Sequence, residues 1–177
     1  IEVVDGDGQS ATVGEAVDTP PGIIVKDADG EPIEGISVMF EVTEGDGSVS
    51  PEEATTDDDG IAAVTSWTLG ETAGLNELTV SADDPGNETT PASLTITATG
   101  ISGEAAQIIK NAGDFQEATV GTAVATPPSV RVTDEYNNPV SGEPVFFSAF
   151  PDGSQVSGGS KTTGTDGIAT VGGWTMS

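Results

Sequence analysis

The sequence predicts an all-β protein made of two consecutive β-sandwiches, of which the second lacks its last two strands. One reason is an internal repeat that extends through most of the 177 residues. The other is that each repeat contains short segments in which apolar and polar residues alternate, separated by turns rich in Gly, Pro and Asp. No segment shows the 3.6-residue period of an amphipathic helix, and the abundance of Thr and Val favours strands.

The repeat has an offset of 107 residues, which is the distance from Ala11 to Ala118. The Ala-Thr-Val-Gly segment at residues 11–14 recurs at 118–121, and the Asp-Gly-Ile-Ala segment at 59–62 recurs at 166–169. This period is too long for a solenoid unit and fits one small domain. We therefore predict a first domain at residues 1–101 and a second at residues 102–177.

The strands of the first repeat follow one another in chain order. Residues 23–26 form a short β-rich segment. Residues 36–43 alternate strictly and place four apolar side chains on one face, namely Ile36, Val38, Phe40 and Val42. Apolar residues (Leu, Val, Ile or Ala) alternate with Thr or Ser at residues 78–82 and 94–98. Turn-forming residues separate these strands at 27–32, 57–60 and 84–87. About seven strands over about 100 residues are typical of a sandwich of two sheets.

The second repeat reproduces only the first part of this pattern. Residues 130–133 correspond to the first β-rich segment. Residues 144–150 are expected to form a strand with Val145, Phe147 and Ala149 on one face. The chain reaches Ser177 at the position equivalent to Gly70. We therefore expect the second sandwich to lack the two strands that correspond to residues 71–100.

Two interpretations of the open second sandwich remain. In one, the 177 residues are an excerpt of a longer array of repeats. In the other, a strand from a neighbouring subunit fills the gap, as in donor-strand complementation, and head-to-tail repetition produces a filament. An unfilled edge would favour aggregation.

Both repeats carry the same two motifs. The first is Val-x-Asp-x-x-x-x-Pro-x-x-Gly-x-x-Val-x-Phe, from Val25 and again from Val132. The second is Thr-Thr-x-x-Asp-Gly-Ile-Ala-x-Val-x-x-Trp, from Thr55 and again from Thr162. The combination resembles the bacterial immunoglobulin-like repeats of the invasin and intimin type. The resemblance implies tandem immunoglobulin-like β-sandwiches that are exported and exposed on a bacterial cell surface.

The composition excludes several function classes. The chain has 30 Asp and Glu against 4 Lys and Arg, a net charge of −26, and neither His nor Cys. A Ser-His-Asp triad, a thiolate nucleophile, a zinc finger and a disulfide framework are therefore ruled out. So few basic residues cannot neutralise a phosphate backbone, so we expect no nucleic-acid partner. No apolar run is long enough for a membrane span. We expect the protein not to be an enzyme.

The acidic residues are distributed along most of the chain, which is typical of a solvated surface. Either the protein is adapted to high salt, where carboxylates maintain solubility, or it is an ordinary secreted domain of low pI.

Acidic turns of the first repeat are candidate calcium sites, because Ca²⁺ prefers carboxylate and carbonyl oxygens. The candidate metal ligands are Asp27, Asp29, Asp57 and Asp59. The alternative is that these residues form solvated turns. The second repeat favours this alternative, because Tyr136 replaces Asp29 and Gly164 replaces Asp57. No other cofactor is expected.

The aromatic residues divide into two groups. Trp67 and Trp174 occupy equivalent positions, and we expect them in the core, with stacking on sugars as the alternative. Phe115 and Tyr136 have no aromatic counterpart in the first repeat and are expected to be more exposed.

These observations predict a non-enzymatic extracellular module that acts as a spacer or stalk in a large bacterial surface adhesin. Its expected partners are neighbouring repeats or subunits and an unknown surface receptor or glycan. A filament subunit completed by strand exchange and a glycan- or calcium-dependent binding module are the alternatives.

Overall fold

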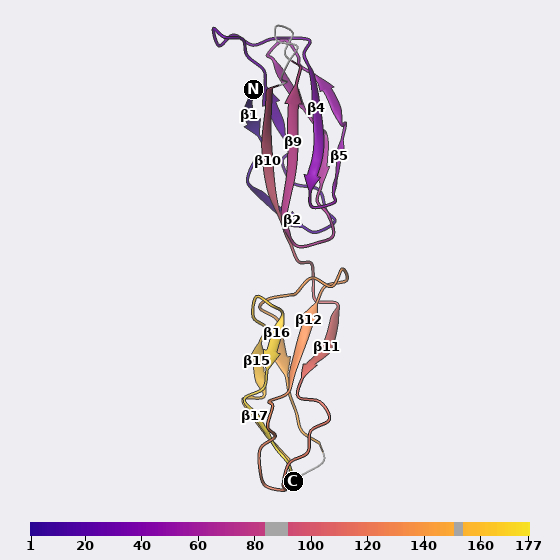
Figure 1. Ribbon diagram of the computed structural model, residues 1–177, viewed down its shortest axis with the longest axis vertical. Coiled ribbons are helices and arrows are strands. Elements are labelled where there is room, and N and C mark those ends of the chain that lie inside the picture. The colour runs from indigo at the N-terminus through magenta and orange to yellow at the C-terminus, as the bar shows by residue number, and fades with distance from the viewer. Residues whose placement is uncertain (84–91, 151–153) are drawn as a thin grey trace. The chain divides into compact units, whose positions relative to one another are not determined.

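The computed structural model describes residues 1–83, 92–150 and 154–177, and all regular elements among them are β-strands. The chain divides into two compact units, Ile1–Ile101 (unit 1) and Ser102–Ser177 (unit 2) (Figure 1). The all-β prediction is confirmed. The turn predicted at residues 84–87 lies outside the described residues. The described residues include no helix that is long and apolar enough to cross a membrane.

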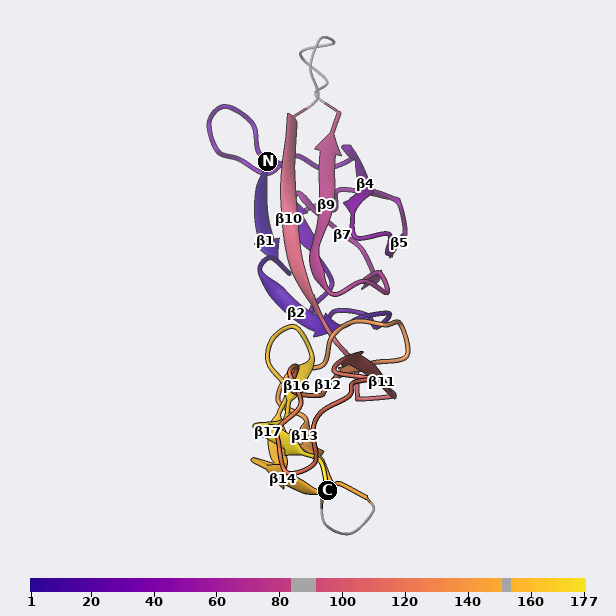
Figure 2. The same ribbon diagram turned by 60° about the horizontal axis from the view of Figure 1, so that its bottom comes forward.

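Unit 1 contains a three-stranded sheet, a five-stranded sheet and a two-stranded ribbon. In spatial order the first sheet is β1 (Glu2–Asp5), β3 (Gly22–Ile24) and β7 (Ile61–Ala63). The second is β2 (Gln9–Thr12), β10 (Ala92–Ile101), β9 (Gly74–Ala82), β4 (Ser37–Glu44) and β6 (Glu53–Thr55). The ribbon pairs β5 (Ser48–Ser50) with β8 (Ser66–Thr68). Figure 2 shows β9 and β10 side by side along this unit.

The pairing of β2 with β10 differs from the other strand pairs of unit 1, because it is parallel. Gln9 lies opposite Ala98, and the register continues to Thr12 opposite Ile101. The Gly8 amide donates to the Thr97 carbonyl at 2.9 Å. Residues 8–12, near the start of unit 1, are therefore hydrogen-bonded to residues 97–101 at its end.

The core of unit 1 lies where the alternating residues were expected. Phe40 is 1% exposed and Trp67 is fully buried, which confirms the core position predicted for this tryptophan. Other buried side chains come from strands of both sheets, namely Ile23, Val38, Leu78, Val80 and Ile96.

Unit 2 has one three-stranded sheet and two ribbons. The sheet consists of β11 (Gln107–Ala112), β12 (Ser129–Thr133) and β16 (Ile168–Thr170). The ribbons are β13 (Pro144–Phe146) with β15 (Ser160–Thr162), and β14 (Gln155–Ser157) with β17 (Gly173–Thr175). Its hydrophobic cluster is small and consists of Val132, Val140, Val145 and Ala169.

Two segments of unit 2 form less strand than their counterparts in unit 1, and both differences have one cause. The strand predicted at 144–150 is limited to β13, Pro144–Phe146. Residues 116–119, which are equivalent to β2, form no strand. In unit 1 the equivalent segments pair with β9 and β10, and the described part of unit 2 contains no counterpart of these two strands. Backbone without a ladder partner does not hold an extended strand.

Candidate functional site

The two acidic turns of unit 1 have the same internal hydrogen bonding. Asp27 Oδ1 accepts from the backbone N–H groups of Asp29 and Glu31, both at 2.9 Å. Asp57 Oδ1 accepts in the same way from Asp59 at 3.0 Å and Ile61 at 2.9 Å. Each aspartate thus uses one carboxylate oxygen to shape its own turn, as turn aspartates commonly do.

The four calcium candidates, Asp27, Asp29, Asp57 and Asp59, are all exposed. The two turns are linked through the backbone, because the Val25 amide donates to the Gly60 carbonyl at 2.9 Å. Within residues 1–83, 92–150 and 154–177, no three acidic side chains gather closely enough to hold a metal ion. Calcium binding by these residues stays a prediction.

A groove of about 360 Å³ lies beside the first acidic turn. Ile1 and Glu2 form one side, Ile24 and Lys26 another, and the turn at residues 27–30 completes it. Lys26 Nζ lies 2.5 Å from Glu2 Oε2, and this hydrogen bond and charge hold the pKa of Glu2 below its usual value. The groove is thus lined by carboxylates and the Lys26 side chain together with the apolar side chains of Ile1 and Ile24.

The equivalent aspartate of unit 2, Asp134, is in a different environment, because it is only 1% exposed. Its Oδ1 accepts from the backbone N–H groups of Tyr136 and Asn138, and its Oδ2 accepts from Asn138 Nδ2 and from the Gly103 amide at 3.0 Å. Burial raises the pKa of Asp134, but these hydrogen bonds outweigh burial, so the pKa lies below its ordinary value. Asp134 therefore holds the start of unit 2 against its first turn.

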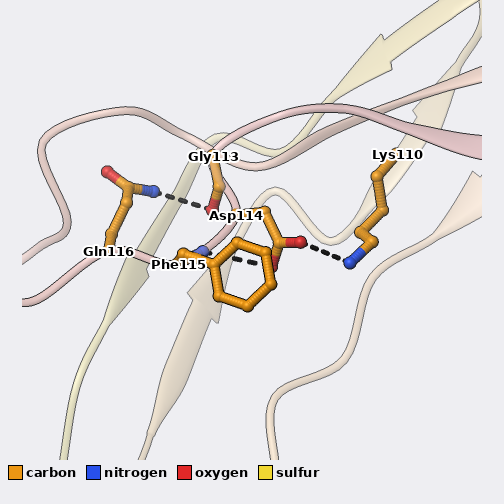
Figure 3. A network of polar contacts seen from close by, with 5 residues as sticks. All are labelled: Lys110, Gly113, Asp114, Phe115 and Gln116. Carbon is orange, nitrogen blue, oxygen red and sulfur yellow. Dashed lines mark hydrogen bonds and ion pairs between the residues drawn. The ribbon is translucent and has the colours of Figure 1, made fainter.

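Unit 2 also presents an exposed turn with an aromatic residue (Figure 3). Phe115 is 97% exposed and has a positive φ of 52°, whereas its counterpart in unit 1 is Gly8. Lys110 forms an ion pair with Asp114, and its Nζ lies 5.4 Å from the centre of the Phe115 ring. Asp114 Oδ1 also accepts from the Phe115 amide at 3.1 Å, so the turn holds the aromatic ring out toward solvent.

A second groove, of about 400 Å³, lies on the open face of unit 2. Ile108, Val132, Val145 and Phe146 contribute apolar side chains to its lining. Ile108 is 61% exposed and Phe146 is 78% exposed. In unit 1 the residue equivalent to Val145 is Val38, which pairs with Ala82 of β9 and is fully buried. The edge of β13 that corresponds to this pairing has no partner strand in the described part of unit 2.

Both units share two sets of side-chain hydrogen bonds that fix the backbone. Gln9 Nε2 donates to the carbonyls of Gly6 and Thr19, and its Oε1 accepts from the Thr19 amide. Gln116 makes the same three bonds in unit 2, to Gly113 and to both backbone groups of Thr126 (the bond to Gly113 is drawn in Figure 3).

The second shared arrangement is a buried threonine. Thr56 Oγ1 accepts from the Ile36 amide at 2.9 Å and donates to the Ile33 carbonyl at 2.7 Å. Thr163 repeats these distances with Glu143 and Val140. The repeat in the sequence is therefore a repeat of specific backbone-fixing contacts.

Sequence reasoning located some of these residues and missed others. The predicted exposure of Phe115 and Tyr136 is confirmed, at 97% and 38%. Trp174, expected in the core, is only partly buried, because the strands that enclose Trp67 in unit 1 have no counterpart in the described part of unit 2. The burial of Asp134 was missed. Its alignment with Asp27 indicated a turn aspartate but not burial, because Asp27 is exposed and the amide that covers Asp134 lies 31 residues away at Gly103.

The sequence is similar to a known domain family and to a curated protein. Residues 18–97 match the family model for the bacterial Ig-like domain (group 1). A curated relative, the inverse autotransporter adhesin YeeJ of Escherichia coli (strain K12), is 30% identical over 158 residues, covering 83% of this chain. The chain corresponds to 6% of the length of that relative.

Two solved structures are also similar. The D0-D1 domain of intimin aligns with 99% of this chain and 86% of its own, at 21% identity and a TM-score of 0.41. The D00-D0 domain of intimin aligns with 99% of this chain and 85% of its own, at 14% identity and a TM-score of 0.45.

Proposed function

Since the chain consists of bacterial immunoglobulin-like repeats of the invasin and intimin type, we propose that it is a non-enzymatic structural module of a bacterial cell-surface adhesin. Its role is that of a spacer or stalk, which carries a binding region away from the cell surface. It functions outside the cell, and its immediate neighbours are other repeats of the same protein.

The observation that carries this proposal is the parallel pairing of β2 with β10. The two strands belong to the beginning and the end of unit 1, and they run in the same direction. When the two ends of the unit are pulled apart, β2 and β10 are drawn in opposite directions along their length. Their hydrogen bonds are then loaded together in shear and do not open one at a time. A unit built in this way is suited to transmit tension along a chain of repeats.

The repeated polar contacts support the same role. The glutamine arrangement and the buried threonine recur in both units with closely similar distances, while the exposed turns differ. The part that is duplicated is thus the part that maintains the fold, as expected when repeats supply length.

A surface-display experiment tests the spacer role. The 177-residue chain is inserted between an outer-membrane anchor and a small binding domain of known ligand, and capture of ligand-coated beads is measured. The matched control replaces the chain with a Gly/Ser linker of 177 residues, which is flexible. We expect better bead capture through a surface polysaccharide layer with the chain than with the linker. Equal capture would contradict the spacer role.

A binding role is the second candidate, and the exposed Lys110–Asp114–Phe115 turn favours it. An aromatic ring that is almost fully exposed and flanked by a cation is a common anchor for protein or glycan contacts. The display experiment includes the chain without the added binding domain. Saturable adhesion of those cells to host cells or glycans, lost in Phe115→Gly, would assign the binding role. The glycine variant restores the residue of unit 1 and suits the positive φ.

A filament role is the third candidate, and the open apolar face of unit 2 favours it. Exposed strand edges and apolar surface promote pairing with other chains. Light scattering in high salt, at several protein concentrations, separates the candidates. A constant mass of 17.7 kDa agrees with the spacer proposal. A mass that rises with concentration would favour strand exchange between subunits.

A further inference from the structure

We propose that the groove beside Asp27 in unit 1 is a binding site for an extended peptide of the Ser-Gly-Glu-Ala-Ala-Gln type, the segment that leads into an immunoglobulin-like repeat. The inference deepens the spacer proposal and rests on it. It names the contact that joins a repeat to the segment of chain that precedes it in an array of repeats. It concerns a part of unit 1 that the proposed function does not use.

The argument starts from unit 2, where such a segment is in place. Residues 102–107 have the sequence Ser-Gly-Glu-Ala-Ala-Gln. The Gly103 amide donates to Asp134 Oδ2 at 3.0 Å, and the Ala106 amide donates to the Thr133 carbonyl at 2.9 Å. Gln107 then lies opposite Thr133 as the first residue of β11. The segment thus extends β11 along the end of β12 and covers the first turn of the unit.

Unit 1 has the same acceptors in the same register. Asp27 is equivalent to Asp134, and Lys26 is equivalent to Thr133. The pairing of Glu2 with Ile24 in β1 and β3 repeats that of Ile109 with Arg131 in β11 and β12. The 360 Å³ groove begins where β1 begins, and Lys26 and Asp27 line it. Its position is therefore the one that residues 103–107 occupy in unit 2.

The state of the two aspartates agrees with this assignment. Both use Oδ1 to accept two backbone N–H groups of their own turn. Oδ2 of Asp134 accepts the Gly103 amide and the residue is buried, whereas Asp27 is exposed. A carboxylate oxygen at a groove with an adjacent backbone carbonyl selects a peptide that offers two N–H groups in an extended conformation. The glycine of the peptide has no side chain to obstruct the approach of its amide to the carboxylate.

The test adds Ser-Gly-Glu-Ala-Ala-Gln directly before Ile1 of the full chain, so that the added Gln precedes Ile1 as Gln107 precedes Ile108. Amide hydrogen exchange of the added Gly is measured by NMR. Gly103 of the same molecule is the internal reference, because it has the expected bond. We expect exchange of the added Gly to be slowed about tenfold or more relative to an unstructured peptide, because hydrogen bonds to charged groups are strong.

Two matched variants of the extended chain separate the groove from other causes. Asp27→Asn keeps an oxygen for the turn but places an N–H₂ group at the second position, so we expect the protection of the added Gly to be lost. Asp29→Asn leaves Asp27 intact, and we expect the protection to be retained. Rapid exchange of the added Gly while unit 1 is folded, or protection that persists in Asp27→Asn, would overturn the inference. The display experiment does not involve this extension, so the spacer proposal stands or fails separately.

Discussion

At the scale of single residues, the fold depends on a few buried polar groups that fix the backbone between strands. Thr56 and Thr163 are 3% and 4% exposed, and each hydroxyl joins an amide and a carbonyl from a neighbouring segment. A buried polar group with both partners satisfied is favourable, and removing one partner leaves the others unpaired at a cost.

The first prediction follows from this arrangement. Thr56→Val should lower the free energy of unfolding of unit 1 by about 1–3 kcal/mol, because the Ile36 amide and the Ile33 carbonyl lose their partner. Urea unfolding followed by tryptophan fluorescence measures it, in a Trp174→Phe background so that the buried Trp67 alone reports. Thr99→Val, on the exposed side of β10, is the control and should change stability by less than about 0.5 kcal/mol. Equal effects of the two substitutions would contradict the role of Thr56.

The second prediction concerns pH and Asp134. Its pKa is lowered in the folded state, so it contributes stability that is present above its unfolded pKa of about 3.9. This stability is lost as the pH falls below about 4, through the lower folded pKa. Asp134→Asn should destabilise unit 2 at pH 7, because its amide N–H₂ faces the Gly103 amide. The difference between wild type and variant should shrink as the pH falls from about 4 to 2 in urea unfolding. A constant difference would show that the carboxylate charge is unimportant.

At the scale of elements, most strands could be predicted because their signal is local. The alternation at residues 36–43 corresponds to β4, and that at 78–82 to the second half of β9. The strand expected at 144–150 was wrong beyond Phe146, although its sequence alternates as well as that of β4. An alternating pattern predicts which face of a strand is apolar. The strand also requires a neighbouring strand to hydrogen-bond its backbone, and that neighbour is distant in sequence.

The candidate sites could be predicted less well than the strands, for the same reason. The lack of an aromatic counterpart indicated that Phe115 is exposed. The cover of Asp134 depends on a single backbone amide in a segment of Gly and Ala, which carries no pattern that points to an aspartate. The groove of unit 1 is defined by comparison between the units and not by a motif.

The third prediction tests the role of β9 and β10. A chain extended after Ser177 by a copy of residues 71–101 should have a more stable unit 2, because the copied strands can pair with β13 and with residues 116–119, as β9 and β10 pair with β4 and β2 in unit 1. Hydrogen exchange of residues 145–150 should become slower, and residues 144–150 should form one continuous strand. A copy in which residues equivalent to Leu78, Val80 and Ile96 are replaced by Ser is the control. Unchanged exchange with the unaltered copy would show that the short β13 has another cause.

At the scale of the whole molecule, a net charge of −26 acts on both units. Repulsion among like charges disfavours a compact state and is screened by salt, since the Debye length falls from about 10 Å at 0.1 M to about 3 Å at 1 M. Only two ion pairs offset it among the described residues, Lys26 with Glu2 and Lys110 with Asp114.

The fourth prediction is therefore that the midpoint of thermal unfolding rises as NaCl is increased from about 0.05 to 1 M. A variant with Glu34, Glu52 and Glu135, all exposed, changed to Gln should show a smaller rise. A midpoint that is independent of salt would mean that the carboxylates are too well solvated to repel one another.

The proposal that unit 1 transmits tension is tested most directly by pulling single molecules between two defined points. The chain has no cysteine, so two introduced cysteines fix the points of attachment. With one cysteine added before Ile1 and one at Ile101, the parallel pair of β2 and β10 is loaded in shear. With the first moved to Glu15, beyond the end of β2, the same pair is opened from the end where Thr12 lies opposite Ile101. We predict a clearly higher unfolding force in the first geometry than in the second. Equal forces in the two geometries would contradict the proposal that unit 1 is built to transmit tension.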